Sequence, residues 1–134
     1  MRAIDLIVIH CSSTRENYAL TEQALEASHR LIGFDGTGYH FYVRRDGRVL
    51  ATRPVSKVGA HARGYNAHSI GICYEGGLDR YGNPKDTRTE WQRHSLSVLV
   101  GKLYVCSGAQ GPQSRPERKR RSGTHGVDQA MSLL

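Results

Sequence analysis

The chain of 134 residues has only three cysteines and no long apolar run. Cys11, Cys73 and Cys106 are an odd number without close pairs, so they predict neither a disulfide framework nor a zinc finger, and we expect buried thiols. No apolar stretch approaches the ~20 residues of a membrane-spanning helix. The N-terminus also lacks the basic and apolar regions of an export signal. The expectation is therefore a soluble chain in the cytoplasm.

Acidic residues are scarce. Twelve Asp and Glu face 19 Lys and Arg, which gives a formal net charge of +7 and indicates an anionic partner. Nucleic acid, a membrane surface or an acidic cell-wall polymer would all fit. Much of the excess lies in residues 115–121, where no aromatic residue is interleaved and no groove-reading motif occurs, so a specific nucleic-acid site is not predicted.

Two strands are indicated by short apolar runs. Leu6, Val8 and their neighbours are apolar on both faces, which is typical of a central strand in a covered sheet. Residues 69–74 form a second run of this kind. Between the two, residues 39–43 and 48–51 flank Asp46-Gly47 and predict a hairpin with Tyr39, Phe41 and Val43 on one face.

Two helices are indicated by capping residues and spacing. Thr21 is a plausible N-cap for a helix whose apolar positions include Leu31 and Ile32. A longer helix ends near Cys106 and begins after Thr87 or Thr89, either of which could cap it. Residues 107–122 have almost no apolar side chain and no periodicity. We therefore predict a domain over 1–106 and a disordered basic tail over 107–134.

Three aromatic or imidazole side chains could carry chemistry. His10 ends the first strand, where it could bind a metal or simply cap the strand by ordinary hydrogen bonds. Tyr39 could be a strand aromatic and His61 a surface loop residue. A catalytic zinc needs three protein ligands and an open position, so none of these residues is decisive alone.

Taken in order, the segments around these residues resemble the zinc-dependent N-acetylmuramoyl-L-alanine amidases, which include phage amidase-type lysozymes and peptidoglycan-recognition proteins. The similar segments are 7–12, 38–49, 58–66 and 69–73, and the resemblance covers roughly residues 4–104. It implies an α/β fold, with a central mixed β-sheet flanked by helices. It also implies cleavage of the amide between N-acetylmuramic acid and L-alanine by a zinc-activated water.

The resemblance carries roles to individual residues. His10 matches the first zinc ligand, and Tyr39 matches the tyrosine that assists at the metal-bound water or oxyanion. His61 matches a histidine that stabilises developing charge or orients substrate. Asn66 lies in the same loop and is expected to contact the glycopeptide. Peptidoglycan is the expected partner of a monomer that acts at the cell wall once released.

The chain departs from the family after residue 105. The resemblance calls for a second His ligand and a Cys ligand beyond the long helix, and neither motif is present. Cys106 and His125 are the late candidates, without the family's flanking residues. We therefore expect weak zinc binding or none. This predicts an impaired hydrolase or, alternatively, a metal-free, non-catalytic peptidoglycan-binding module.

The genetic code suggests an origin for this departure. Residues 108–116 can be encoded so that the reading frame one base later gives Gly-His-Arg-Asp, and permitted codons up to Leu134 can restore a Cys-Pro-Cys ending. Both missing ligand motifs would then return together. The hypothesis is that the tail derives from a frameshift, which would also explain its cluster of basic residues.

Overall fold

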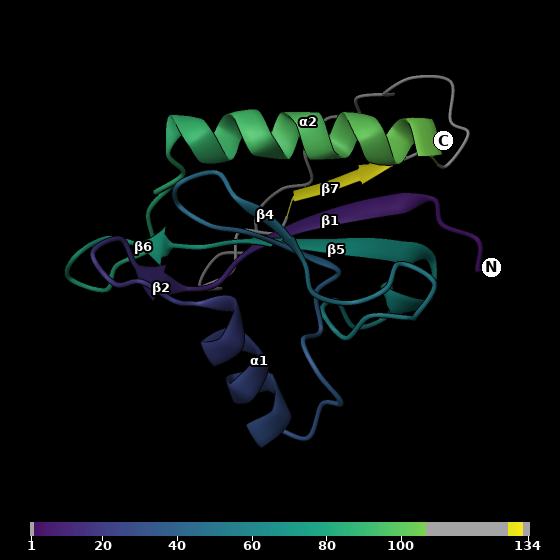
Figure 1. Cartoon of the computed structure of the whole chain (residues 1–134), viewed down its shortest axis with the longest axis horizontal. Coiled ribbons are helices and arrows are strands. Elements are labelled where there is room, and N and C mark those ends of the chain that lie inside the picture. Colours follow the sequence, from purple (N-terminus) through teal and green to yellow (C-terminus); the bar gives the residue numbers. More distant parts are fainter. Residues whose placement is uncertain (1, 107–128, 133–134) are drawn as a thin grey trace.

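The computed structural model describes residues 2–106 and 129–132. Two helices pack around a five-stranded sheet of order β4-β3-β5-β1-β7, and a separate two-stranded sheet pairs β2 with β6 (Figure 1). The helices are α1 (Glu22–Leu31) and α2 (Glu90–Cys106), and a short 3-10 helix covers Asn66–His68. The strands are β1 (Leu6–Cys11), β2 (Thr14–Arg15), β3 (Phe41–Val43), β4 (Val49–Ala51), β5 (Ser69–Tyr74), β6 (Gly77–Leu78) and β7 (Gln129–Ser132).

The three inner strands of the large sheet run parallel. β5 pairs in parallel with β1 on one side and with β3 on the other, while β4 and β7 are antiparallel to their neighbours. The register places His10 opposite Cys73 and Tyr42 opposite the same cysteine. The carboxyl ends of β1, β3 and β5 therefore lie at one edge of the sheet.

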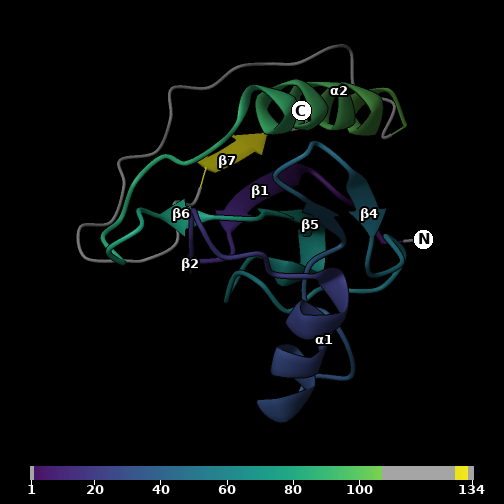
Figure 2. The same cartoon turned by 60° about the vertical axis from the view of Figure 1, so that its left-hand side comes forward.

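The helices cover opposite faces of the sheet (Figures 1 and 2). Alternate residues of β1 and β5 point towards α2, because side chains of a strand alternate between its faces. They form the larger core with Leu96, Leu99, Val100 and Leu103 of α2. The opposite face carries a smaller cluster of Leu25, Tyr42 and Cys73 beside α1. It also carries His10, which alternates with Ile9 and Cys11.

The expected mixed sheet with flanking helices is confirmed, as are the two buried strands. Thr21 caps α1, since its hydroxyl accepts a hydrogen bond from the Ala24 N–H at 3.1 Å. The hydroxyl of Thr89 accepts from the Gln92 N–H at 3.1 Å, so Thr89 caps α2. Thr87 instead accepts from the Gly77 N–H.

Several expectations about where side chains pack and how exposed they are prove wrong. β3 begins only at Phe41, so the alternation does not reach Tyr39, which packs with the small cluster on the α1 face. Leu31 and Ile32 lie at the end of α1, 87% and 69% exposed, because the helix extends beyond the sheet. Cys106 is exposed, whereas Cys11 and Cys73 are buried as expected.

The expectation of disorder throughout 107–134 is wrong for residues 129–132. These residues form β7, which pairs with β1. A strand at the edge of a sheet has unpaired backbone N–H and C=O groups. These groups can pair with a further strand whatever side chains that further strand carries. The rest of the predicted tail lies outside the described residues. No helix in the described part of the chain is long and apolar enough to cross a membrane.

Candidate functional site

His10 lies near the carboxyl end of β1 on the α1 face, with 6% of the residue exposed. Its Nε2 is 2.9 Å from Nδ1 of His61. One of these nitrogens must donate and the other accept, since two neutral acceptors or two N–H groups cannot form this bond. His10 therefore has a hydrogen-bond partner among the described residues, and its role as a zinc ligand stays a prediction.

His61 packs flat over β5 because residue 71 has no side chain. A Cβ built on Gly71 would lie 2.5 Å from two ring atoms of His61. The other ring nitrogen, Nε2, is 3.2 Å from the hydroxyl of Ser69. His61 is thus positioned by both ring nitrogens and by contact with the strand.

Tyr39 completes the group. Its ring centroid is 5.3 Å from that of His10 and 6.4 Å from that of His61. Its ring centroid is also 5.4 Å from that of His29 of α1. The three catalytic and metal-binding residues expected from the sequence are therefore brought together from three distant segments.

Two further histidines support this group and were not predicted as site residues. The Gly38 N–H donates to His29 Nδ1 at 2.8 Å, and burial lowers the pKa of His29. Burial likewise lowers the pKa of His40, whose Nδ1 accepts from the Gly71 N–H at 3.0 Å. Both rings are therefore neutral and hydrogen-bond the backbone near this group. Their partners lie 9 and 31 residues away in the sequence, so this role could not be predicted from neighbouring residues.

The environment of His40 also settles its tautomer. Because Nδ1 accepts from Gly71, Nε2 carries the hydrogen and donates to the Lys57 carbonyl at 2.8 Å. Arg2 Nη2 lies 3.1 Å from the same Nε2. This contact is a close approach of two donors rather than a hydrogen bond, and the nearby positive charge further disfavours protonation of His40.

Asn66 lies behind His61. Its side-chain oxygen accepts hydrogen bonds from the backbone N–H groups of His61 and Ala62, at 2.9 and 3.0 Å. This geometry holds the 61–66 loop in shape. The contact of Asn66 with glycopeptide stays a prediction.

The described residues do not provide a complete zinc site. A catalytic zinc needs three protein ligands, and no three His, Cys, Asp or Glu side chains converge in residues 2–106 and 129–132. Cys73 is on the same face as His10, but burial raises its thiol pKa well above the usual value and so disfavours the thiolate that binds metal. Cys106 ends α2 on the other face, and His125 lies outside the described residues.

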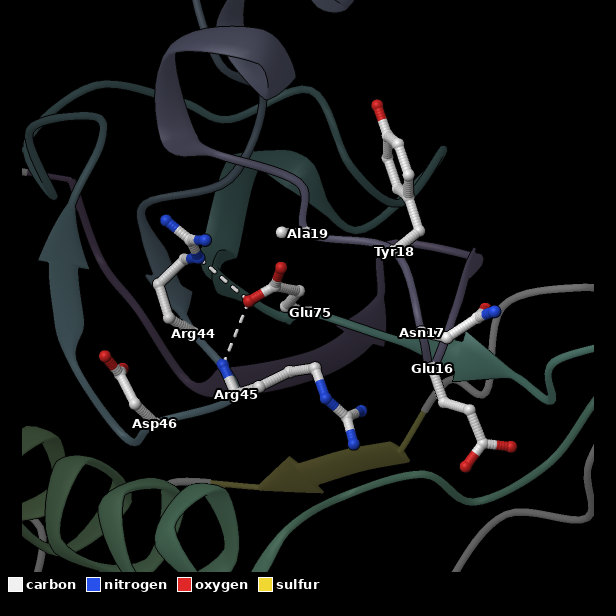
Figure 3. Close-up of a pocket in the computed structure, with 8 residues that line it drawn as sticks. All are labelled: Glu16, Asn17, Tyr18, Ala19, Arg44, Arg45, Asp46 and Glu75. Carbon is white, nitrogen blue, oxygen red and sulfur yellow. Dashed lines mark hydrogen bonds and ion pairs between the residues drawn. The ribbon is translucent and has the colours of Figure 1, made fainter.

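A separate pocket of about 350 Å³ lies at the carboxyl edge of the parallel strands. Figure 3 shows Glu75 at its centre, Arg44 and Asp46 on one side, and Glu16, Asn17 and Tyr18 on the other. Ala19 and Arg45 complete the lining. The sequence did not predict this pocket, although the Arg44-Arg45 pair at a strand end was a visible signal.

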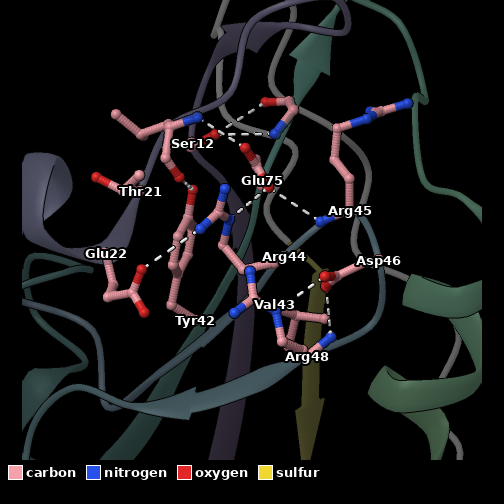
Figure 4. A network of polar contacts seen from close by, with 12 residues as sticks. Ser12, Thr21, Glu22, Tyr42, Val43, Arg44, Arg45, Asp46, Arg48 and Glu75 are labelled. Atoms are coloured by element: carbon pink, nitrogen blue, oxygen red, sulfur yellow. Dashed lines mark hydrogen bonds and ion pairs between the residues drawn. The ribbon is translucent and has the colours of Figure 1, made fainter.

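Glu75 organises this pocket. Only 2% of its side chain is exposed, and its Oε1 accepts from Arg44 Nε at 2.8 Å and from the Arg45 N–H at 3.0 Å (Figure 4). Its Oε2 accepts from the Leu20 N–H at 2.7 Å. The carboxylate thereby connects three segments and raises the pKa of Arg44.

The sequence is similar to known proteins over most of its length. Residues 1–116 match the family model of N-acetylmuramoyl-L-alanine amidase. The endolysin of Escherichia phage T7 is 41% identical over 106 residues, which make up 78% of this chain and 70% of that protein. Endolysins of Klebsiella phage KP32 and Enterobacteria phage K11 are 39% and 40% identical over 74% and 75% of this chain. The matches span 66% and 64% of their lengths, slightly under two thirds.

Solved structures share the fold. The N-acetylmuramoyl-L-alanine amidase LysC from Clostridium intestinale matches with a TM-score of 0.67 and 32% identity, over 81% of this chain and 72% of that chain. Human PGRP-IBETAC, solved in complex with glycosamyl muramyl pentapeptide, matches with a TM-score of 0.59 over 75% of this chain and 62% of that chain. At 18% identity, the latter similarity concerns the fold alone.

Proposed function

The chain belongs to the N-acetylmuramoyl-L-alanine amidase family, and we propose that it acts on peptidoglycan as an amidase-type hydrolase whose zinc activation is impaired. The bond to be cleaved is the amide between N-acetylmuramic acid and L-alanine. The proposal rests on one observation above all. His10, Tyr39 and His61 are in mutual contact on the α1 face of the sheet.

These three side chains are suited to hold a muropeptide. The Tyr39 ring offers an apolar surface with a polar end beside the hydrogen-bonded imidazoles of His10 and His61. His61 is oriented by Ser69 and by the loop that Asn66 stabilises. A positioned group of this kind loses little freedom when substrate binds, which favours affinity.

The impairment follows from the number of ligands. His10 is one of the three expected zinc ligands, and the described residues supply no complete set. With two ligands missing, zinc would bind far more weakly than in an intact site. The chain would then hydrolyse peptidoglycan slowly or not at all while keeping its binding residues.

A second candidate function is a metal-free peptidoglycan-binding module. The bond between His10 Nε2 and His61 Nδ1 favours it, because both nitrogens already have a partner within the protein. In this case the wall is bound without release of peptides.

The two functions are separated by measuring zinc and products on the full chain. We expect substoichiometric but detectable zinc by elemental analysis, slow but measurable release of L-alanine peptides, and retained binding of muropeptides. Stoichiometric zinc with rapid release would reject the impairment, and binding without zinc or release would support the second candidate. Failure to bind both muropeptides and intact sacculi would reject the proposed function.

The same experiment includes a matched pair of variants. His61→Ala should weaken muropeptide binding because it removes the partner of His10. Val98→Ala changes a half-exposed position on α2, across the sheet, and should leave binding unchanged. Equal binding by both variants would argue against a site at His10 and His61.

The frameshift hypothesis has its own test. Sequencing of the gene should show that the frame one base later, over codons 108–134, encodes a Gly-His-Arg-Asp motif and a Cys-Pro ending. If that frame encodes neither a His nor a Cys-Pro, the hypothesis is wrong.

A further inference from the structure

We propose that the pocket around Glu75 is a second binding site, which takes a carboxylate of the peptidoglycan stem peptide on the guanidinium of Arg45. This inference rests on the proposed function for the identity of the ligand. The pocket itself is separate from the group of His10, Tyr39 and His61, none of which lines it.

The location fits a ligand site. In sheets with parallel strands, ligands commonly bind beyond the carboxyl ends of the strands. Arg44 and Arg45 follow β3, Glu75 follows β5, and the 16–19 segment follows β2. With a volume of about 350 Å³, the pocket falls in the ~300–1,000 Å³ range of small-ligand pockets.

The framework of the pocket is already ordered. Glu75 holds the backbone of Leu20 and Arg45 and the side chain of Arg44 in place. Arg44 also contacts Glu22 of α1, at 3.4 Å. Because these groups are positioned before binding, a ligand would not have to order them.

The electrostatics select an anion. Each lining carboxylate has a basic partner within the protein: Glu75 pairs with Arg44 at 2.8 Å, Glu16 with Lys85 at 3.1 Å, and Asp46 with Arg48 at 2.8 Å. Among the described residues, Arg45 is the one charged lining residue without an ion-pair partner.

The guanidinium of Arg45 can donate further hydrogen bonds. Its Nη1 donates to the Thr87 carbonyl at 3.2 Å, which orients the side chain and leaves its other N–H groups without a partner in the described chain. A planar fork of N–H groups matches the two oxygens of a carboxylate. Stem peptides of peptidoglycan carry free carboxylates, so the ligand class follows from the proposed substrate.

Along the sheet, Glu75 of the pocket lies close to the level of His10. His10 is paired with Cys73, and Glu75 lies two residues further along the chain. At ~3.3 Å per residue, this corresponds to about 7 Å along the strand direction.

The test is an NMR titration of the full chain with muramyl-L-alanyl-D-glutamate, which has free carboxylates, and with its diamide. We expect the acid to shift the amides of Ala19, Arg45 and Asp46. The diamide should bind about tenfold more weakly or worse, because a charged hydrogen-bond partner is lost.

Variants of Arg45 test whether its guanidinium binds the carboxylate. Arg45→Gln should weaken binding of the acid by about tenfold or more, whereas the control Arg30→Gln near the end of α1, where Arg30 pairs with Glu26 outside the pocket lining, should leave it unchanged. Arg45→Lys keeps the charge without the fork, and we expect intermediate affinity. Thermal melts of each variant verify folding, and Arg45→Lys serves as the test if Arg45→Gln does not fold.

The outcomes separate the two proposals. Equal affinity of acid and diamide, or of wild type and the Arg45 variants, would overturn the pocket proposal, as would equally tight binding of inorganic phosphate at the same amides. Shifts at His10, Tyr39 and His61 alone would support the proposed function and reject the pocket. Shifts of the pocket amides alone, in a chain that does not bind sacculi, would support a carboxylate site and reject the proposed function.

Discussion

At the scale of single residues, the site depends on glycines, which leave room for the ring of His61. His61 reaches His10 because Gly71 lets the imidazole lie against β5. Gly59 has a similar role, since a Cβ there would lie 2.8 Å from His61 and 2.9 Å from His40. Glycine is used at both positions for close approach and not for an unusual backbone conformation.

Gly71→Ala should displace the His61 ring and break its hydrogen bond with His10. The added methyl group overpacks a buried strand, so we expect a loss of about 1–3 kcal/mol in the free energy of unfolding. Muropeptide affinity should fall with it. Urea denaturation and the NMR signals of the imidazoles measure the two effects.

Gly101→Ala is the matched control. A Cβ at Gly101, in the middle of α2, would meet no atom within 4 Å. Alanine also favours helix over glycine by about 0.8–1 kcal/mol. The control should therefore be as stable as the wild type or more so, with unchanged binding. If both variants behaved alike, steric positioning of His61 by Gly71 would be refuted.

At the scale of elements, the start of α2 is joined to the sheet by a reciprocal cap. The Thr89 hydroxyl accepts from the Gln92 N–H, and the Gln92 side-chain oxygen accepts from the Thr89 N–H at 3.0 Å. This is the capping-box pattern. The Gln92 amide also donates to the carbonyls of Glu75 and Val43, at 2.9 and 3.3 Å. The cap therefore connects α2 to the ends of β3 and β5.

Thr89→Ala should lower the free energy of unfolding by about 1 kcal/mol through loss of the cap. Gln92→Ala should cost more, about 2–3 kcal/mol, because it removes the partner of the Glu75 carbonyl and of the Thr89 N–H, while the Val43 carbonyl keeps its bond from the Glu75 N–H. The urea midpoints of the two variants should differ accordingly. A smaller effect for Gln92→Ala than for Thr89→Ala would contradict this account of how α2 is attached.

At the scale of the whole molecule, the half-buried His29 and the buried His40 make stability depend on pH. Burial lowers the pKa of His29 and of His40 below the ordinary 6.5. The unfolded chain therefore takes up protons at a higher pH than the folded chain. The free energy of unfolding must fall as the pH drops from about 6.5 towards the folded-state pKa values.

Asp86 adds a second, more acidic window of pH. Hydrogen bonds from Arg88 lower its pKa from 3.8 to about 2. A carboxylate with a lowered folded-state pKa stabilises the fold above its unfolded pKa, and this contribution is lost as the pH falls from 3.8 towards 2. In both pH ranges the free energy of unfolding falls as the pH is lowered.

The histidine window is tested with His40→Gln. We expect the wild type to lose stability between pH 7 and 5 and the variant to lose less over the same range. At pH 7 the variant should itself be less stable, because His40 bonds the backbone of both Gly71 and Lys57. Urea unfolding at several pH values gives the slope, and an unchanged slope in the variant would contradict the assignment.

Part of this structure could be predicted from neighbouring residues alone. Apolar runs predicted β1 and β5, Thr21 predicted the start of α1, and Asp46-Gly47 predicted the hairpin of β3 and β4. In each case the signal lies within a few residues, where backbone periodicity and capping act. The resemblance added the grouping of His10, Tyr39 and His61, which the structure reproduces.

The sequence by itself determined β1, β5, the β3–β4 hairpin and the two helices, because local periodicity and capping depend on residues close together in the chain. Only the tertiary structure decided the rest. Glu75 joins Leu20, Arg44 and Arg45 across 30 to 55 residues, and His10 meets His61 across 51. Such contacts depend on how the sheet is assembled. For that reason the hydrogen bond between His10 and His61, the packing of Tyr39 on the α1 face and the pocket at the strand ends could be seen only in the folded chain.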